Sequence, residues 1–265
     1  MDLLQAVVLA IVQGITEFLP VSSSGHLILT PRFFGWPDQG LAFDAAIHIG
    51  TLAAVVFYFR RQLGQMARAW IASVTRREHS PDSRLAWAVL WGTLPVLIVG
   101  YLFNDYIEQH FRTPLLVALQ LAVFGVLLWL ADWLGKQRRD EYSVGWGDVA
   151  AIGCAQALAL IPGTSRSGVT MTAALSLGLT REAAARYSFL LAVPGTAAAA
   201  LYECWRMFHN GHAIEWEPVT VAILLAAVSG FLCIHFLLRF IQKIGMLPFA
   251  IYRLLLAALI VYVFA

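Results

Sequence analysis

Charged residues are scarce in this 265-residue chain: they make up 13% of it, against roughly a quarter in an ordinary soluble domain. Hydrophobic residues make up 60%, and the mean hydropathy is +0.72. The net charge is only +2, and no basic patch of the kind that binds nucleic acid is present, so we expect no nucleic-acid partner. This composition excludes a soluble domain and predicts one all-α integral membrane domain over residues 1–265.

Cysteine is scarce as well. Cys154, Cys204 and Cys233 are scattered in or beside apolar runs and lack the spacing of metal ligands. We expect them to pack as small hydrophobic side chains.

Apolar stretches of membrane length dominate the rest of the chain. Six can cross ~30 Å of hydrocarbon as helices: residues 41–59, 85–103, 114–134, 187–205, 218–238 and 246–264. Two more, 3–29 and 148–178, each contain a proline and a Ser/Gly-rich turn near the middle. Such a break is tolerated in a bilayer only when it is buried in protein or lines a wet cavity. We therefore expect two re-entrant helical hairpins.

The distribution of Lys and Arg predicts the orientation. With both stretches re-entrant, 13 of these residues fall on one side, and Arg32, Arg112 and Arg206 on the other. If the second stretch crossed instead, the division would be 10 to 6. The positive-inside rule favours the first arrangement. It places the arginine-rich 60–84 loop in the cytoplasm and both chain termini outside.

Short segments recur along the chain in the same order. The pairs are 13–25 with 156–168, 50–54 with 195–199, and 94–95 with 247–248. They predict a duplication, with repeat one over 1–134 and repeat two over 145–265, each with one hairpin and three spans. Three crossings invert the second copy, so the broken helices of both halves meet near the midplane. The alternative is chance similarity among small residues.

The first hairpin carries a cluster of chemically active side chains. Gln13 and Glu17 lie four apart and share a helix face. Ser22–Ser24 follow Pro20, and His26 begins the returning helix. A carboxylate can bind a hard cation or act as a base, and an activated Ser or His can attack phosphorus. Alternatively, the acid and the imidazole are hydrogen-bonded core groups, and the serines cap a helix.

The second hairpin lacks an acid but supplies a cation among small residues. Arg166 lies between Ser165 and Ser167, followed by Gly168 and Thr170. A guanidinium binds phosphate oxygens in a bidentate manner, and the following helix start adds positive potential. This pattern predicts a phosphate-binding site. Alternatively, the arginine only neutralises the acid of the first hairpin, which would also bring the two hairpins face to face.

Residues 13–26 and 162–168 resemble the two signature motifs of the undecaprenyl-diphosphatase family, the bacitracin-resistance type. The similarity continues through 188–194 and 248–253. It implies a bacterial enzyme that hydrolyses undecaprenyl diphosphate to undecaprenyl phosphate and inorganic phosphate. This would recycle the lipid carrier for peptidoglycan synthesis and give bacitracin resistance.

The resemblance also implies residue roles. Glu17 matches the family's second acidic position, Ser23 and His26 its catalytic segment, and Arg166 its phosphate-binding arginine. Gln13 stands where many members have Glu, so Glu17 and Gln13 are the expected ligands of a divalent cation, Mg²⁺ or Ca²⁺. The catalytic residues expected are thus Glu17, Ser23, His26 and Arg166, on the periplasmic side of the inner membrane.

The expected substrate-binding residues complete the site: Gln13, Ser22, Ser24, Ser165, Ser167, Gly168 and Thr170. Either Ser23 or His26 attacks phosphorus, or one of them activates water; if Ser23 attacks, His26 is the expected base.

Several weaker expectations remain. Asp44 and His48 share a helix face and could help to position metal or substrate, and Arg253 is expected to snorkel or to pair with an acid. Membrane lipids are expected partners, and a homodimer is an option that the sequence leaves open. The alternative function is a transporter or flippase for polyprenyl phosphate lipids, because paired hairpins in inverted repeats are a transporter architecture.

Overall fold

The computed structural model describes residues 2–37, 39–210 and 216–264, without the side chains of 41, 42, 104, 105, 108, 203, 204 and 206–210. The expectations for the side chains of Cys204 and Arg206 therefore lie outside the described residues. Within these ranges the secondary structure is helical, apart from one isolated bridge between Arg139 and Leu179. The predicted all-α membrane fold is confirmed.

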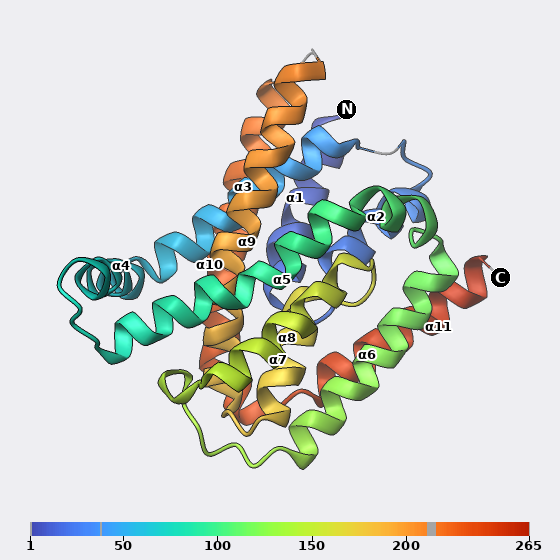
Figure 1. The fold of residues 1–265 in the computed structure, drawn as a ribbon. Helices are drawn as coiled ribbons and strands as arrows, with labels where there is room; N and C mark the ends of the chain where they lie inside the picture. The colour runs from blue at the N-terminus through green and yellow to red at the C-terminus, as the bar shows by residue number, and fades with distance from the viewer. Residues whose placement is uncertain (1, 38, 211–215, 265) are drawn as a thin grey trace.

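The helices fall into two series along the chain (Figure 1). The first is α1 (Leu3–Phe18), α2 (Ser23–Phe34), α3 (Leu41–Tyr58), α4 (Arg60–Thr75), α5 (Pro81–His110) and α6 (Pro114–Leu134). The second is α7 (Trp146–Ala157), α8 (Arg166–Ser176), α9 (Arg181–Asn210), α10 (Trp216–Ile244) and α11 (Leu247–Phe264), with short 3-10 turns η1 (Glu141–Ser143) and η2 (Leu158–Leu160).

Five helices of the described chain are long and apolar enough to cross a membrane: α5, α6, α9, α10 and α11. The pair α3 and α4 meets the same criteria only together, and its two arms are bent by 79°. The structure thus gives five or six spans, where the sequence predicted six. Both α1 and the α7–η2 segment are shorter apolar helices, in keeping with hairpin arms.

The segment 60–84, expected to be a loop, is largely helical. Helix α4 begins directly after α3 and buries Gln62, Met66 and Ser73 on one side, while Arg68 is exposed. The expectation was wrong because it relied on the density of arginines. An amphipathic helix needs only one apolar stripe, and its opposite face can carry all the charge.

The two hairpin turns have the same local geometry. Ser22 and Ser165 have φ angles of 74° and 72°, in a region that non-glycine residues seldom adopt. Each serine caps the following helix, because its Oγ accepts a hydrogen bond from the N–H of Gly25 or Gly168 (3.3 and 3.1 Å). Both helices therefore start in the same way, 143 residues apart.

The packing places the hairpins inside the other helices. Figure 1 shows α1, α2, α7 and α8 centrally, with α6 and α11 along one flank and α9 and α10 along another. Helix α10 packs on α1 and α3, α5 on α7, and α6 on both α8 and α11. The rings of Phe18 and Phe189 meet edge to face at 5.4 Å, and both are buried. This contact fixes the end of α1 against α9, next to the site.

Candidate functional site

The two hairpins meet through an ion pair. Glu17, near the end of α1, accepts a hydrogen bond on Oε1 from Nη2 of Arg166, the first residue of α8. The Glu17 side chain is 7% exposed and that of Arg166 is 22% exposed. The structure therefore brings together an acid and a guanidinium that are 149 residues apart, as the sequence predicted.

The other oxygen of Glu17 is bound within the first hairpin. Ser23 Oγ donates to Oε2 at 2.6 Å, and Gln13 Nε2 donates to the same oxygen at 2.9 Å. The turn at Pro20 makes this possible, because it folds the start of α2 back onto the last turn of α1. The carboxylate is thus placed to take the Ser23 proton.

Helix α9 orients the guanidinium from the other side. Arg166 Nη1 donates to Thr196 Oγ1 at 2.5 Å and to the Ala192 carbonyl at 3.2 Å. Pro194 lies inside α9 between these two residues. These bonds fix the plane of the guanidinium, so its position does not depend on Glu17 alone.

His26 does not contact Ser23. Its Nδ1 lies 2.7 Å from the Ser22 carbonyl, and its Nε2 lies 2.6 Å from the Tyr252 hydroxyl on α11. A carbonyl can only accept, so Nδ1 carries a proton and Nε2 of the neutral ring accepts from Tyr252. The expectation that His26 is the base for Ser23 is not what this geometry offers, since the hydrogen-bond acceptor of Ser23 is Glu17.

His48 does approach the site, whereas Asp44 points elsewhere. Nε2 of His48, in α3, lies 3.9 Å from Glu17 Oε2. The Asp44 carboxylate instead accepts from Gln39 at 2.8 Å. Of this predicted pair, only His48 is close enough to act on the Glu17 group.

The remaining predicted binding residues lie around the two turns. Ser22 and Ser24 are linked through their hydroxyls (3.3 Å), as are Ser165 and Ser167 (3.2 Å). Ser167 Oγ also donates to the carbonyl of Leu19 at 2.9 Å, which joins the second hairpin to the first.

Two predicted binding groups already have partners within the protein. The Thr170 hydroxyl bonds to the Arg166 carbonyl and to the Ser188 hydroxyl, both at 2.7 Å. The N–H of Gly168 is bonded to Ser165 Oγ. Their observed contacts shape α8 rather than extend toward Glu17.

Arg253 ties the two turns together. Its side chain is completely buried in α11 and donates to the carbonyls of Pro20 (3.1 Å), Gly163 and Thr164 (3.0 Å each), and to two carbonyls of α6 (3.0 and 3.3 Å). It neither snorkels nor pairs with an acid among these contacts. The expectation was wrong because several carbonyls at broken helix ends replace a carboxylate as the partner of the buried charge.

The residues present fit a divalent cation only in part. Among the described residues, no group of three or more His, Cys, Asp or Glu side chains could hold a metal. The Gln13 Oε1 atom, however, is buried beside Glu17 without a hydrogen-bond partner. Mg²⁺ is commonly held by one or two carboxylates together with substrate phosphates. Glu17 and Gln13 fit a cation that takes its other ligands from a phosphate.

The sequence did not single out Thr196, Tyr252 or Ser188 as site residues. Thr196 could have been found from the repeated Gly-Thr segment, since it lies in the second copy. Tyr252 precedes Arg253 in a segment that resembles the family, but its pairing with His26 spans 226 residues and has no local signal.

Comparisons with known proteins agree with these motifs. A family model described as "Bacitracin resistance protein BacA" matches residues 6–259. "Undecaprenyl-diphosphatase 2" of Stutzerimonas stutzeri (strain A1501) is 55% identical, covering 100% of this chain and 99% of the relative. The "Undecaprenyl-diphosphatase" proteins of Nitrosococcus oceani and Thioalkalivibrio sulfidiphilus are each 52% identical over the full length of both chains. The chain with the paired hairpins therefore belongs to the bacitracin resistance protein BacA family.

Proposed function

We propose that this protein removes the terminal phosphate of undecaprenyl diphosphate, giving undecaprenyl phosphate and inorganic phosphate. The observation that carries the proposal is the Glu17 carboxylate, which bonds Ser23 through one oxygen and Arg166 through the other. Family membership and relatives named undecaprenyl-diphosphatase support the substrate. A transporter would need no nucleophile beside a carboxylate, so the alternative is less well supported.

In the proposed mechanism, Arg166 binds the terminal phosphate in a bidentate manner and orients it toward Ser23. Its bonds to Thr196 and the Ala192 carbonyl keep the guanidinium in place when the phosphate replaces Glu17 as its partner. The released Glu17 carboxylate accepts the Ser23 proton, and Ser23 Oγ attacks phosphorus. The bond to the bridging oxygen breaks, undecaprenyl phosphate leaves, and water then hydrolyses the phosphoserine.

A Mg²⁺ or Ca²⁺ ion held by Glu17 and Gln13 would offset negative charge on the phosphate oxygens. The protein residues keep their roles beside it: Gln13 and His48 position the Glu17 carboxylate. His26, held by the Ser22 carbonyl and Tyr252, keeps the first turn of α2 in place. We also propose that the site opens toward the periplasm from the inner membrane, in keeping with the Lys and Arg distribution.

The test is phosphate release from undecaprenyl diphosphate by purified protein in detergent, with and without a chelator. We expect Glu17→Gln, Ser23→Ala and Arg166→Ala each to reduce turnover by roughly 10²–10³-fold or more, as when one transition-state contact is removed. Ser176→Ala is the matched control, because this exposed serine bonds only within α8. Near-normal turnover by Arg166→Ala would contradict the mechanism, and bound lipid with no phosphate release would favour transport.

A further inference from the structure

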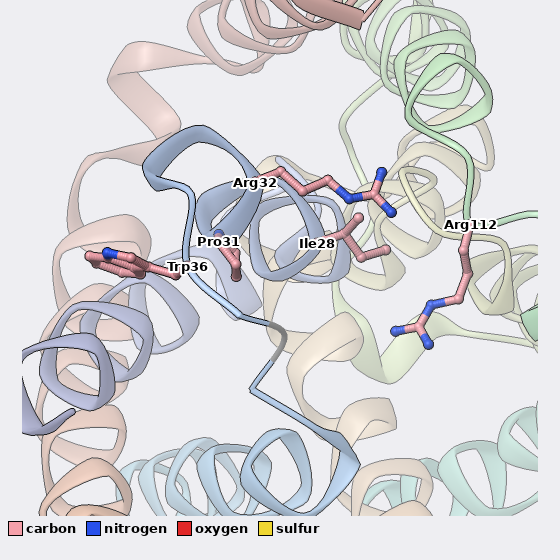
Figure 2. A pocket seen from close by; sticks show the side chains of 5 residues that line it. All are labelled: Ile28, Pro31, Arg32, Trp36 and Arg112. Atoms are coloured by element: carbon pink, nitrogen blue, oxygen red, sulfur yellow. The ribbon is translucent and has the colours of Figure 1, made fainter. Parts of the chain in front are cut away.

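A second group of cationic residues lines a cavity outside the Glu17 site. The cavity has a volume of about 360 Å³ and is lined by Ile28, Pro31, Arg32, Trp36 and Arg112. Figure 2 shows Arg32 extending from α2 toward the segment between α5 and α6 that carries Arg112, with Trp36 on the opposite side. This volume is within the range of small-ligand sites.

The charge at this place is unusual for this face of the molecule. The sequence assigns only three of its 18 Lys and Arg residues to the outer side, and two of them, Arg32 and Arg112, line this one cavity. No acidic side chain is among the described residues that line it. Arg32 lies in the last turn of α2, where a cation offsets the helix dipole, but this does not explain Arg112. Two guanidinium groups beside one cavity favour an anion.

Helix α2 connects this cavity to the Glu17 site. Ser24, Ile28 and Arg32 are spaced by four residues and therefore lie on one face of α2. Arg32 is about 12 Å along the helix from Ser24, at 1.5 Å per residue. Ser24 is linked to Ser22 in the turn, next to Ser23. The same helix face thus leads from the predicted reaction site to the two arginines.

We propose that the cavity between Arg32 and Arg112 is a second phosphate-binding site, through which a phosphate anion passes between the reaction site and the outer surface. This inference rests on the proposed phosphatase function. The anion is either inorganic phosphate leaving after hydrolysis or the diphosphate headgroup arriving before it. Positive potential along a passage raises the local concentration of anions and speeds their transfer.

Direct binding tests the site independently of turnover. Inorganic phosphate is titrated into the purified protein and followed by ³¹P line broadening, in the Arg166→Gln variant so that the reaction site contributes little. We expect binding that disappears when Arg32→Gln and Arg112→Gln are added. The control pair Arg61→Gln and Arg76→Gln removes the same charge from exposed positions of 60–84 and should leave binding unchanged. No phosphate binding in Arg166→Gln, or equal loss in the control pair, would overturn the proposal.

Steady-state kinetics in the otherwise native protein provide a second measurement and identify the anion. If inorganic phosphate uses the cavity, the double variant raises its inhibition constant roughly 10-fold with little change in KM, as expected when a focusing field is removed. If the lipid headgroup uses it, KM rises by a similar factor and phosphate inhibition is unchanged. Kinetics identical to the control pair would contradict both. A protein that binds phosphate here but releases none from the lipid would refute the proposed function and not the site.

Discussion

Arg253 is the residue on which the arrangement of both turns depends. Its guanidinium supplies donors to five backbone carbonyls in α6 and the two hairpins. An ammonium has three donors and no planar fork, so lysine cannot replace it while keeping the charge.

We therefore expect Arg253→Lys to destabilise the protein by roughly 1–3 kcal/mol for each buried carbonyl left without a donor. Turnover should fall as well, because the turns carry Ser23 and Arg166. The thermal midpoint in detergent and phosphate release measure the two effects. Arg239→Lys, at an exposed position of α10, is the control and should change neither. An Arg253→Lys protein with the native midpoint would contradict this role.

At the residue scale, the sequence predicted which side chains meet better than it predicted their pairing. Glu17, Ser23 and Arg166 were all named, because polar groups are costly in apolar segments and few others compete for attention. The acceptor for Ser23 was misassigned to His26, since spacing along a hairpin does not show which way each side chain turns. His26 turns instead toward Tyr252 on α11.

At the scale of elements, two helix pairs approach closely at glycines. Helix α1 meets α10 at Gly14, where a Cβ would lie 2.8 Å from the Ala226 carbonyl oxygen. Helix α7 meets α5 at Gly153, where a Cβ would lie 2.7 Å from the Gly92 oxygen. Backbone atoms cannot move aside as a flexible side chain can, so these contacts require glycine.

Gly153→Ala should destabilise the protein by roughly 1–3 kcal/mol, because the added methyl pushes α7 from α5. Gly147→Ala in the same helix is the matched control. A Cβ there meets nothing within 4 Å, and alanine stabilises a helix by roughly 0.5–1 kcal/mol relative to glycine. Thermal unfolding in detergent compares the two variants. Equal midpoints would show that the α5–α7 contact is not tight.

The long spans and both hairpins could be predicted from the sequence, whereas α4 could not be predicted from charge counting. Long apolar runs and a proline followed by small residues are strong local signals. In α4 the signal is weak, since its buried side includes Gln62 and Ser73. Its 79° bend from α3 depends on packing that no local pattern encodes.

For the whole molecule, the orientation can be tested by labelling. In a variant without its native cysteines, Glu217→Cys should react with a membrane-impermeant maleimide in intact cells, and Lys136→Cys only after lysis. Both positions are exposed, so access and not burial decides the result. The physical reason is that 13 of the Lys and Arg residues lie on the side of Lys136. The opposite labelling pattern would invert the proposed topology.

The division into repeats over 1–134 and 145–265 stays a proposal, which several observations support. The two serine turns match in φ and in capping, and α1 on α10 corresponds to α7 on α5 if the halves are related by duplication. These similarities involve backbone shape, which sequence comparison of small residues detects poorly.

The bonds of Arg253 limit how a lipid can reach the centre of this protein. A carrier that exposes its cargo first to one side and then to the other has to swing its halves apart. Here such a swing would leave a buried guanidinium and several carbonyls without partners, in a place where water cannot compensate. The long isoprenoid chain must therefore slip in sideways between outer helices while the two serine turns stay locked to each other, as suits a stationary reaction chamber better than a shuttle.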